Sequence, residues 1–244
     1  MPISTLASDP KRDVPFKTGE KVTFRIRWFF VPAGEATIEL LPSADFNGNN
    51  AYHFLLTART NEFADFFYKV RDRIESYTDV NMTHSIFYKR RHHAGSKKQV
   101  NVNFDWEKRQ AQYVRLDKGE KRAPISIPPG TFDPLSVFFA FRLHNLNEKK
   151  EITIPVTDGK KMVLGKLSVV KREVVTVDGI AYDTFLVEPE LGEIGGVFEK
   201  SKDAKLQIWV TADRRRIPVM IRSEVVVGSF VAELKSYDAG INVE

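Results

Sequence analysis

The chain has 244 residues, of which 42% are hydrophobic and 28% are charged, so it can bury a sizeable core and is not globally disordered. It contains no cysteine, which excludes disulfides, cysteine-based metal sites and a cysteine nucleophile. The 37 Lys and Arg residues outnumber the 32 Asp and Glu residues. This mild basicity fits contact with an anionic membrane surface, although surface lysines that only serve solubility explain it as well.

The two ends of the chain differ in character. Residues 1–15 contain no apolar segment of the kind found in a signal peptide, and we expect them to form a disordered lead-in. Residues 16–244 contain no linker-like stretch, so we expect a single β-rich domain. No apolar run in the sequence approaches the roughly 18 residues needed to span a membrane as a helix.

The stretch from Phe16 to Leu40 gives the clearest strand signal. Four apolar residues alternate with polar ones, a period of two that predicts a strand with one dry face; they are Val22, Phe24, Ile26 and Trp28. The pattern breaks at residues 32–34, where we expect the turn of a hairpin, and alternation resumes up to Leu40. The apolar face should point into the same interior as the later phenylalanines at 138 and 139.

Similar alternation predicts strands along most of the remaining chain. The expected strands cover residues 51–59, 71–80, 84–95, 97–104, 109–116, 151–156, 161–177, 181–190, 204–213, 217–227 and 229–237. Asp178 and Gly179 form a hairpin-turn pair. The expected fold class is mainly β, a single-domain antiparallel curved sheet or incomplete β-barrel (half-barrel) with two short helices.

The two helices are both rich in phenylalanine. The first, of about ten residues, has Asn61 as its cap and places Phe63, Phe66, Phe67 and Val70 on one face. The second begins at Asp133 as cap, with Pro134 in the first turn, and runs through residues 133–147. Because it is apolar nearly all round, we expect it to be buried on most sides.

Five segments of the chain resemble signatures of the exported bacterial family known as domain of unknown function 3108. These segments are FKTGEKVTFRIRWFFVPAGEATIEL, YKVRDRIESYTD, VNFDWE, FDPLSVFFAFR and LQIWVTADRRRIPVMI. The resemblance implies a leader for export and a periplasmic or envelope location. It also suggests an outline similar to periplasmic lipoprotein carriers of LolA/LolB type, which are incomplete barrels closed by helices over an apolar cavity.

The aromatic residues are the best candidates for a binding site. We expect Trp28, Phe66, Phe67, Phe138, Phe139 and Phe141 to line an apolar pocket inside the curved sheet. Arg71 and Arg142 would lie at its polar mouth and hold an anionic group. The alternatives are an ordinary packed core for the phenylalanines and a helix-to-sheet Arg–Asp bridge for the arginines.

Catalytic and metal chemistry find little support in the sequence. The five histidines show no chelating spacing, since His92 and His93 point to opposite faces of a strand. There is no GxSxG motif and no RNA-binding motif, so we expect neither a metal, nor a cofactor, nor a nucleic-acid partner. If a carboxylate is catalytic, the acids to test are Asp72, Glu75 and Asp79.

Three functions remain open at this point. The leading hypothesis is a non-enzymatic envelope protein that binds a hydrophobic or amphiphilic ligand, such as a lipid or acyl chain, inside the β-wrap. The second is an envelope protein that binds or modifies a glycan with an aromatic and acidic groove. The third is a structural adaptor with a packed core that binds a partner through a sheet edge.

Overall fold

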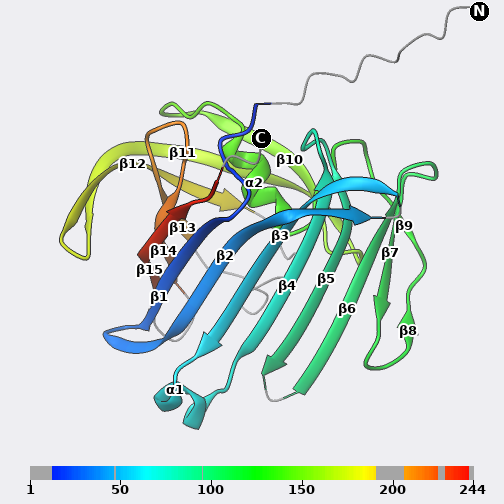
Figure 1. Cartoon of the computed structure of the whole chain (residues 1–244), viewed down its shortest axis with the longest axis horizontal. Helices are drawn as coiled ribbons and strands as arrows, with labels where there is room; N and C mark the ends of the chain where they lie inside the picture. Colours follow the sequence, from blue (N-terminus) through cyan, green and yellow to red (C-terminus); the bar gives the residue numbers. More distant parts are fainter. Residues whose placement is uncertain (1–12, 47, 95, 191–205, 225–228, 242–244) are drawn as a thin grey trace, which may run out of the picture.

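The computed structural model describes residues 13–46, 48–94, 96–190, 206–224 and 229–241, so most of the lead-in expected over residues 1–15 lies outside the described part. The described strands belong to one antiparallel sheet that curves around a buried helix without closing (Figure 1). This confirms the predicted fold class, a mainly β, half-barrel-like sheet with two short helices.

The strands follow the alternation seen in the sequence. Their bounds are β1 Glu20–Trp28, β2 Val31–Phe46, β3 Asn49–Thr60, β4 Arg71–Asp79, β5 Ser85–Ala94, β6 Ser96–Asp105, β7 Gln110–Arg115, β8 Glu120–Lys121, β9 Ile125–Ser126, β10 Glu151–Thr157, β11 Met162–Val177, β12 Ile180–Glu190, β13 Leu206–Thr211, β14 Pro218–Glu224 and β15 Ser229–Ala239. The short strands β8 and β9, which pair with β7, lie in a segment where no strand was predicted.

The strand order is β10-β11-β12-β13-β14-β15-β1-β2-β3-β4-β5-β6-β7-β8. The first and last long strands are therefore neighbours in the middle of the sheet, and Glu20 of β1 lies opposite Ala239 of β15. The Asp178–Gly179 turn between β11 and β12 has positive φ at both residues, as a type I′ hairpin requires, which confirms that prediction.

The core lies between the concave face of the sheet and α2, which spans Ser136–Arg142. One hydrophobic cluster joins Phe54 of β3 and Val102 of β6 to Val156 of β10 and Ile208 of β13, with Phe139 of α2 in the same cluster. Since these residues come from both halves of the strand order, the sheet must curl until its two halves share one core.

The first hairpin turns at a different place from the one predicted. The turn lies at Phe29 and Phe30, and Phe29 has a φ of 51°, whereas the predicted turn residues 32–34 lie inside β2. Pro32 is tolerated in the strand because it sits at a register shift opposite Arg27. Gly34 is required there, since a Cβ atom would come 2.1 Å from the carbonyl oxygen of Arg59.

The predicted dry face of β1 is only partly correct. Val22 and Phe24 are buried, and Val22 lines the same interior cavity as Phe138 and Phe139. Trp28, at the end of the strand, is exposed because the hairpin extends past the covering elements of the core. Strand periodicity gives the face of a residue but not the point at which the core ends.

Both helices are shorter than predicted. The first, α1, spans Glu62–Phe67 and is capped as expected, because the Asn61 side chain accepts a hydrogen bond from the amide of Ala64. It ends at Phe67, three residues short of Val70, and β4 begins at Arg71. Helix α2 has seven residues; Asp133 binds the amides of Leu135 and Ser136, and helical geometry begins only after this turn.

Candidate ligand site at the end of helix α2

Helix α2 is held at its start by a carboxylate that is fully buried. Asp133 has no exposed surface, and its Oδ2 atom accepts hydrogen bonds from the hydroxyls of Ser76, Ser85 and Ser136 at 2.5–2.6 Å. Oδ1 accepts the two backbone amides described above. Hydrogen bonds of this number can offset the desolvation of a carboxylate, so Asp133 fixes the start of α2 onto β4 and β5.

The end of α2 is held by a buried ion pair. Arg142 donates to both carboxylate oxygens of Glu20, over 2.6 Å from Nη1 and 3.0 Å from Nη2, and its Nε donates to the carbonyl oxygen of Arg215 at 2.9 Å. Its guanidinium lies against the rings of Phe16 and Phe139, 5.3 and 5.5 Å from their centroids. This bidentate, stacked geometry requires arginine.

A second arginine completes the contact between α2 and the turn from β13 to β14. Arg216 donates from Nη1 to the carbonyl oxygens of Arg142 and Arg214, both at 2.8 Å, and from Nη2 to Oδ1 of Asn145 at 2.9 Å. Arg142 of α2 therefore binds a backbone carbonyl of the turn from β13 to β14, and Arg216 of that turn binds a backbone carbonyl of α2. The carbonyls of Ala140 and Phe141 accept backbone amides that follow the helix, and the carbonyl of Arg142 accepts the hydrogen bond from Arg216. A cation is favourable at this end of a helix.

The three consecutive arginines of this turn differ in their partners. Arg214 pairs with Asp13, and Arg215 forms two hydrogen bonds to Asp213 at 2.8 and 2.6 Å. Arg216 is buried and contacts only neutral oxygens among the described residues. Burial and the nearby charges of Arg142 and Arg214 lower the pKa of Arg216. Arg216 is thus a cation that an anionic ligand would stabilise.

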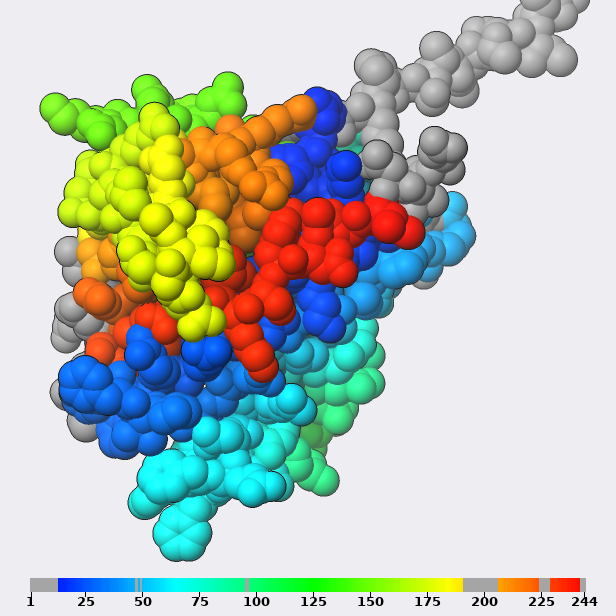
Figure 2. All heavy atoms as spheres, turned by 60° about the vertical axis from the view of Figure 1, so that its left-hand side comes forward, coloured from blue at the N-terminus to red at the C-terminus, as the bar shows by residue number. Residues whose placement is uncertain are grey.

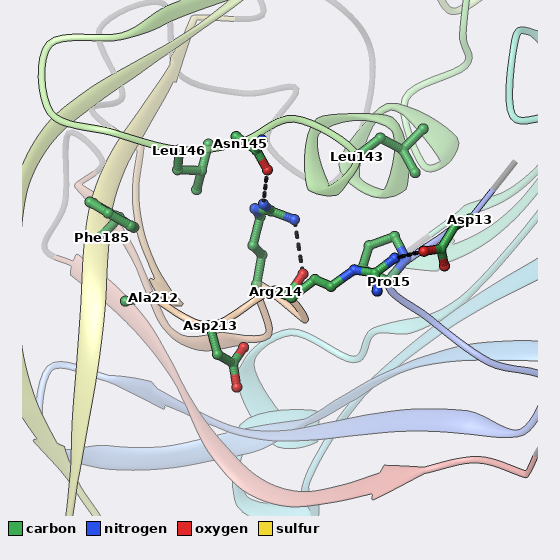
Figure 3. A pocket seen from close by; sticks show the side chains of 10 residues that line it. Asp13, Pro15, Leu143, Asn145, Leu146, Phe185, Ala212, Asp213 and Arg214 are labelled. Atoms are coloured by element: carbon green, nitrogen blue, oxygen red, sulfur yellow. Dashed lines mark hydrogen bonds and ion pairs between the residues drawn. The ribbon is translucent and has the colours of Figure 1, made fainter.

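Two hollows meet beside Arg216. The larger is a polar pocket of about 540 Å³, bounded by the segment after α2 and by the turn from β13 to β14 (Figure 3). The smaller is an apolar cavity of about 70 Å³ lined mainly by aliphatic and phenylalanine side chains, including Phe138, Phe139 and Phe141. Leu146 and Arg216 line both, so the two hollows are adjacent. A polar pocket next to an apolar cavity is complementary to an amphiphile, a ligand with a polar group and an apolar chain.

The predicted site residues fall into two groups. Phe138, Phe139, Phe141 and Arg142 line the apolar cavity, with Arg142 already occupied by Glu20. Trp28, Phe66, Phe67 and Arg71 lie at the opposite end of the strands, around the first hairpin turn and α1. Arg71 is bound there by Asp65, through hydrogen bonds of 3.0 and 2.6 Å. The structure therefore does not bring the two groups into one pocket.

Sequence reasoning missed Glu20 and Arg216. Glu20 is a single acid at the start of a strand, and its partner is 122 residues away in the chain. Arg216 stands in the run Asp213-Arg214-Arg215-Arg216, which reads as a solvated turn. A weak signal was available, because Ile217 and Pro218 follow at once and place Arg216 at the entry of a buried strand.

No cluster of three or more His, Asp or Glu side chains with metal-binding geometry exists among the described residues. None of the helices in the described ranges is long and apolar enough to cross a bilayer. Of the acids considered as catalytic candidates, Asp72 binds His92, Glu75 binds Arg73 and His53, and Asp79 accepts backbone amides of its own turn.

The fold and site define the class as an open, half-barrel-like β-protein with a buried helix. The sequence profile of a protein family of unknown function, DUF3108, matches residues 23–235, and the chain belongs to this family. This confirms the resemblance found in the sequence. No curated protein is similar to the chain.

Solved structures with a similar fold are distant in sequence. A beta-barrel-like protein of domain of unknown function DUF1849 from Brucella abortus is 8% identical, with a TM-score of 0.56 over 91% of this chain and 97% of that one. A protein provisionally described as exported, with a YmcC-like fold, from Bacteroides fragilis is 9% identical, with a TM-score of 0.34 over 92% of this chain and 98% of that one. A provisionally described lipoprotein from Parabacteroides distasonis is 8% identical, with a TM-score of 0.34 over 93% and 100%. The first supports the fold alone, and the other two are too dissimilar to support an argument.

Proposed function

We propose that this chain is a non-enzymatic protein of the cell envelope that binds an anionic amphiphile at the end of α2. The polar group of the ligand would occupy the pocket of about 540 Å³ and contact Arg216, and its apolar part would enter the cavity beside Phe138. The observation that carries the proposal is Arg216 itself, a buried cation without a carboxylate partner among the described residues, shared by a polar and an apolar hollow. The envelope location follows from what the family resemblance implies.

The size of the apolar cavity limits the mode of binding. At about 70 Å³ it is far below the 300–1,000 Å³ of typical ligand pockets, so an acyl chain does not fit without movement of side chains. Phe138 is the only phenylalanine of α2 that is partly exposed, and it also lines this cavity. Leu146 lines both hollows, so its movement is the one that would extend the cavity toward the polar pocket.

The experiment starts with protein purified from its own host and examined by native mass spectrometry for bound lipid. The same protein is then titrated with a fluorescent fatty acid and with its uncharged alcohol analogue. We expect the fatty acid to bind more tightly. The variant Arg216→Gln should lose about tenfold or more of this affinity, because a charged hydrogen bond contributes about 1.5–3 kcal/mol.

Arg115→Gln is the matched control, since it removes an arginine charge that Asp117 already neutralises and that lines neither hollow. Because Arg216 also supports the end of α2, Arg216→Lys serves as a second variant that keeps the charge and should keep the preference for the anion. Absence of native lipid together with equal, weak binding of both probes would contradict the proposal.

The adaptor hypothesis is the second candidate, and the small cavity favours it. An apolar cavity of only about 70 Å³ is compatible with an ordinary core, and the sheet retains edge strands, such as β10. The glycan hypothesis has less support, since the polar pocket is lined by neither Trp nor Tyr, and its carboxylates at 13 and 213 are bound by arginine.

A further inference from the structure

The end of the sheet opposite α2 carries large aromatic side chains in water. Phe30 is 90% exposed, Phe66 87% and Phe67 71%. Further exposed aromatic residues of the first hairpin turn and α1 are Trp28, Phe29, Phe63 and Tyr68. Soluble proteins rarely expose so many aromatic residues at one place, and such patches mark surfaces that bind membranes or proteins. We call these seven residues the aromatic end.

The two segments of the aromatic end are joined. The Asn61 side chain, which caps α1, also donates from Nδ2 to the carbonyl oxygen of Pro32 at 2.7 Å, and its amide donates to the carbonyl oxygen of Ala33 at 3.0 Å. Figure 2 shows the first hairpin (blue) and α1 (cyan) beside each other at the lower end of the molecule, where both project outward. The surface is therefore a set of protruding tips, a shape that suits insertion into a soft surface.

Basic residues follow the aromatic end across the sheet. The strand register places Arg59, Arg71, His93 and Lys97 directly opposite one another on four successive strands, β3 to β6. Directly opposite residues share a face of the sheet, and this face is the outer one, because the alternate positions Ile74 and Val100 are buried. Arg73 and Arg91 form a second opposed pair on the same face.

The charge balance of this region is positive. Glu35 pairs with both Arg59 and Lys235, Asp65 pairs with Arg71, and Glu75 pairs with Arg73. Lys69, next to α1, and Lys97 are exposed and form no ion pair within the described ranges. Arg91 and His93 are exposed on the same side. Aromatic tips beside basic side chains are the combination found on proteins that rest at the interface of an anionic bilayer.

We propose that the aromatic end docks the protein onto an anionic lipid bilayer, with Phe30, Phe66 and Phe67 inserted at the level of the headgroups and the basic face of β3 to β6 against the lipid charges. The main contribution of this surface to binding is apolar. The surface lies at the other end of the strands from α2, where the proposed ligand site is, so its test does not depend on that site.

The test measures partitioning of the full chain onto vesicles of phosphatidylcholine alone and of phosphatidylcholine mixed with phosphatidylglycerol. We expect binding to the mixed vesicles that weakens with salt. Phe66→Ser and Phe67→Ser should each weaken it about tenfold, since burial of a phenylalanine drives insertion. Lys97→Ala should weaken binding about fivefold on the mixed vesicles and leave binding to phosphatidylcholine alone unchanged.

Leu164→Ser is the matched control, because Leu164 is an exposed apolar residue on β11 outside the aromatic end. Insertion also gives a spectroscopic signal, a blue shift of Trp28 fluorescence that Trp28→Phe should abolish while binding persists. Equal binding of Phe66→Ser, Phe67→Ser and wild type would overturn the proposal. So would a lipid-independent dimer, seen by sedimentation, that Phe66→Ser converts to a monomer, because the aromatic end would then be a protein interface.

Discussion

Helices α1 and α2 have similar compositions and opposite surroundings. The sequences EFADFF and SVFFAFR are both short and rich in phenylalanine, and a polar side chain binds backbone amides at the start of each, Asn61 in α1 and Asp133 in α2. Six of the seven residues of α2 are buried, whereas no residue of α1 is. The difference arises from position in the sheet, since α2 crosses the concave face and α1 connects two strands at their ends. The same residue type therefore stabilises the fold in one helix and is available for an external surface in the other.

The polar contacts of the two helices differ in the same way. Arg142 of α2 meets Glu20 where water is excluded, and Arg71 beyond α1 meets Asp65 at the surface. Water screens the second pair but not the first. Substitutions at the end of the sheet that holds α2, the core end, should therefore change the free energy of unfolding strongly, and substitutions at the aromatic end should change it weakly. Four predictions follow from this contrast, from the largest expected effect to the smallest.

The largest effect is expected from Phe139→Ala. The Phe139 ring stacks on Phe54 with centroids 3.8 Å apart and contacts Phe16 edge-on at 5.3 Å. Its removal should lower the free energy of unfolding by about 4 kcal/mol, the range for a buried phenylalanine. The matched substitution Phe66→Ala should change it by less than about 0.5 kcal/mol. Urea denaturation of both variants measures the contrast, and similar losses would show that α1 is packed in solution.

A slightly smaller loss is expected from Glu20→Gln. Removing one partner of a buried ion pair leaves the Arg142 charge without compensation, which costs about 3 kcal/mol. The double variant Glu20→Gln, Arg142→Met should recover part of the loss, so a double-mutant cycle should show positive coupling. Asp65→Asn, at the exposed pair of α1, is the control and should leave global stability nearly unchanged. An additive cycle at residues 20 and 142 would contradict the buried pair.

The cap of α1 should have a moderate, local effect. Asn61→Ala removes the acceptor for the Ala64 amide and the bond to the Pro32 carbonyl, with an expected loss of about 1 kcal/mol. Hydrogen exchange at the amide of Ala64 should accelerate while exchange in β6 stays the same. If the variant also loses binding to mixed vesicles, the cap positions the aromatic end; if exchange at Ala64 is unchanged, α1 does not depend on its cap.

The smallest effect is a pH dependence at the core end. His84 lies against Trp106, with ring centroids 4.4 Å apart, and burial lowers its pKa from 6.5 despite the opposing influence of Asp79. The unfolded chain therefore takes up a proton at a higher pH than the folded chain. Stability should fall as the pH drops below about 6.5 and level off below the folded-state pKa. For His84→Gln, the midpoint of thermal unfolding should change less between pH 7 and 5 than it does for the wild type. His93→Gln, at an exposed residue of the aromatic end, is the control and should behave as the wild type does.

The sequence by itself determined the fold class, most of the strands and the presence of the two helices. These depend on local periodicity, turn residues and caps, so Asp178–Gly179 and Asn61 could be identified without knowledge of their neighbours. The candidate pocket residues of α2 could also be named, since a helix apolar on all sides must be buried.

Only the tertiary structure decided which end of the sheet each aromatic residue occupies. Phe66 and Phe139 both lie in short helices rich in phenylalanine, so the local sequence does not distinguish them. Their different burial depends on the strand order and on the curl that brings β10 to β13 over α2. Glu20 and Arg216 acquire their roles from partners more than 70 residues away, in contacts that no local pattern encodes. Separation of the predicted pocket into a ligand site and an aromatic end is a consequence of this long-range geometry.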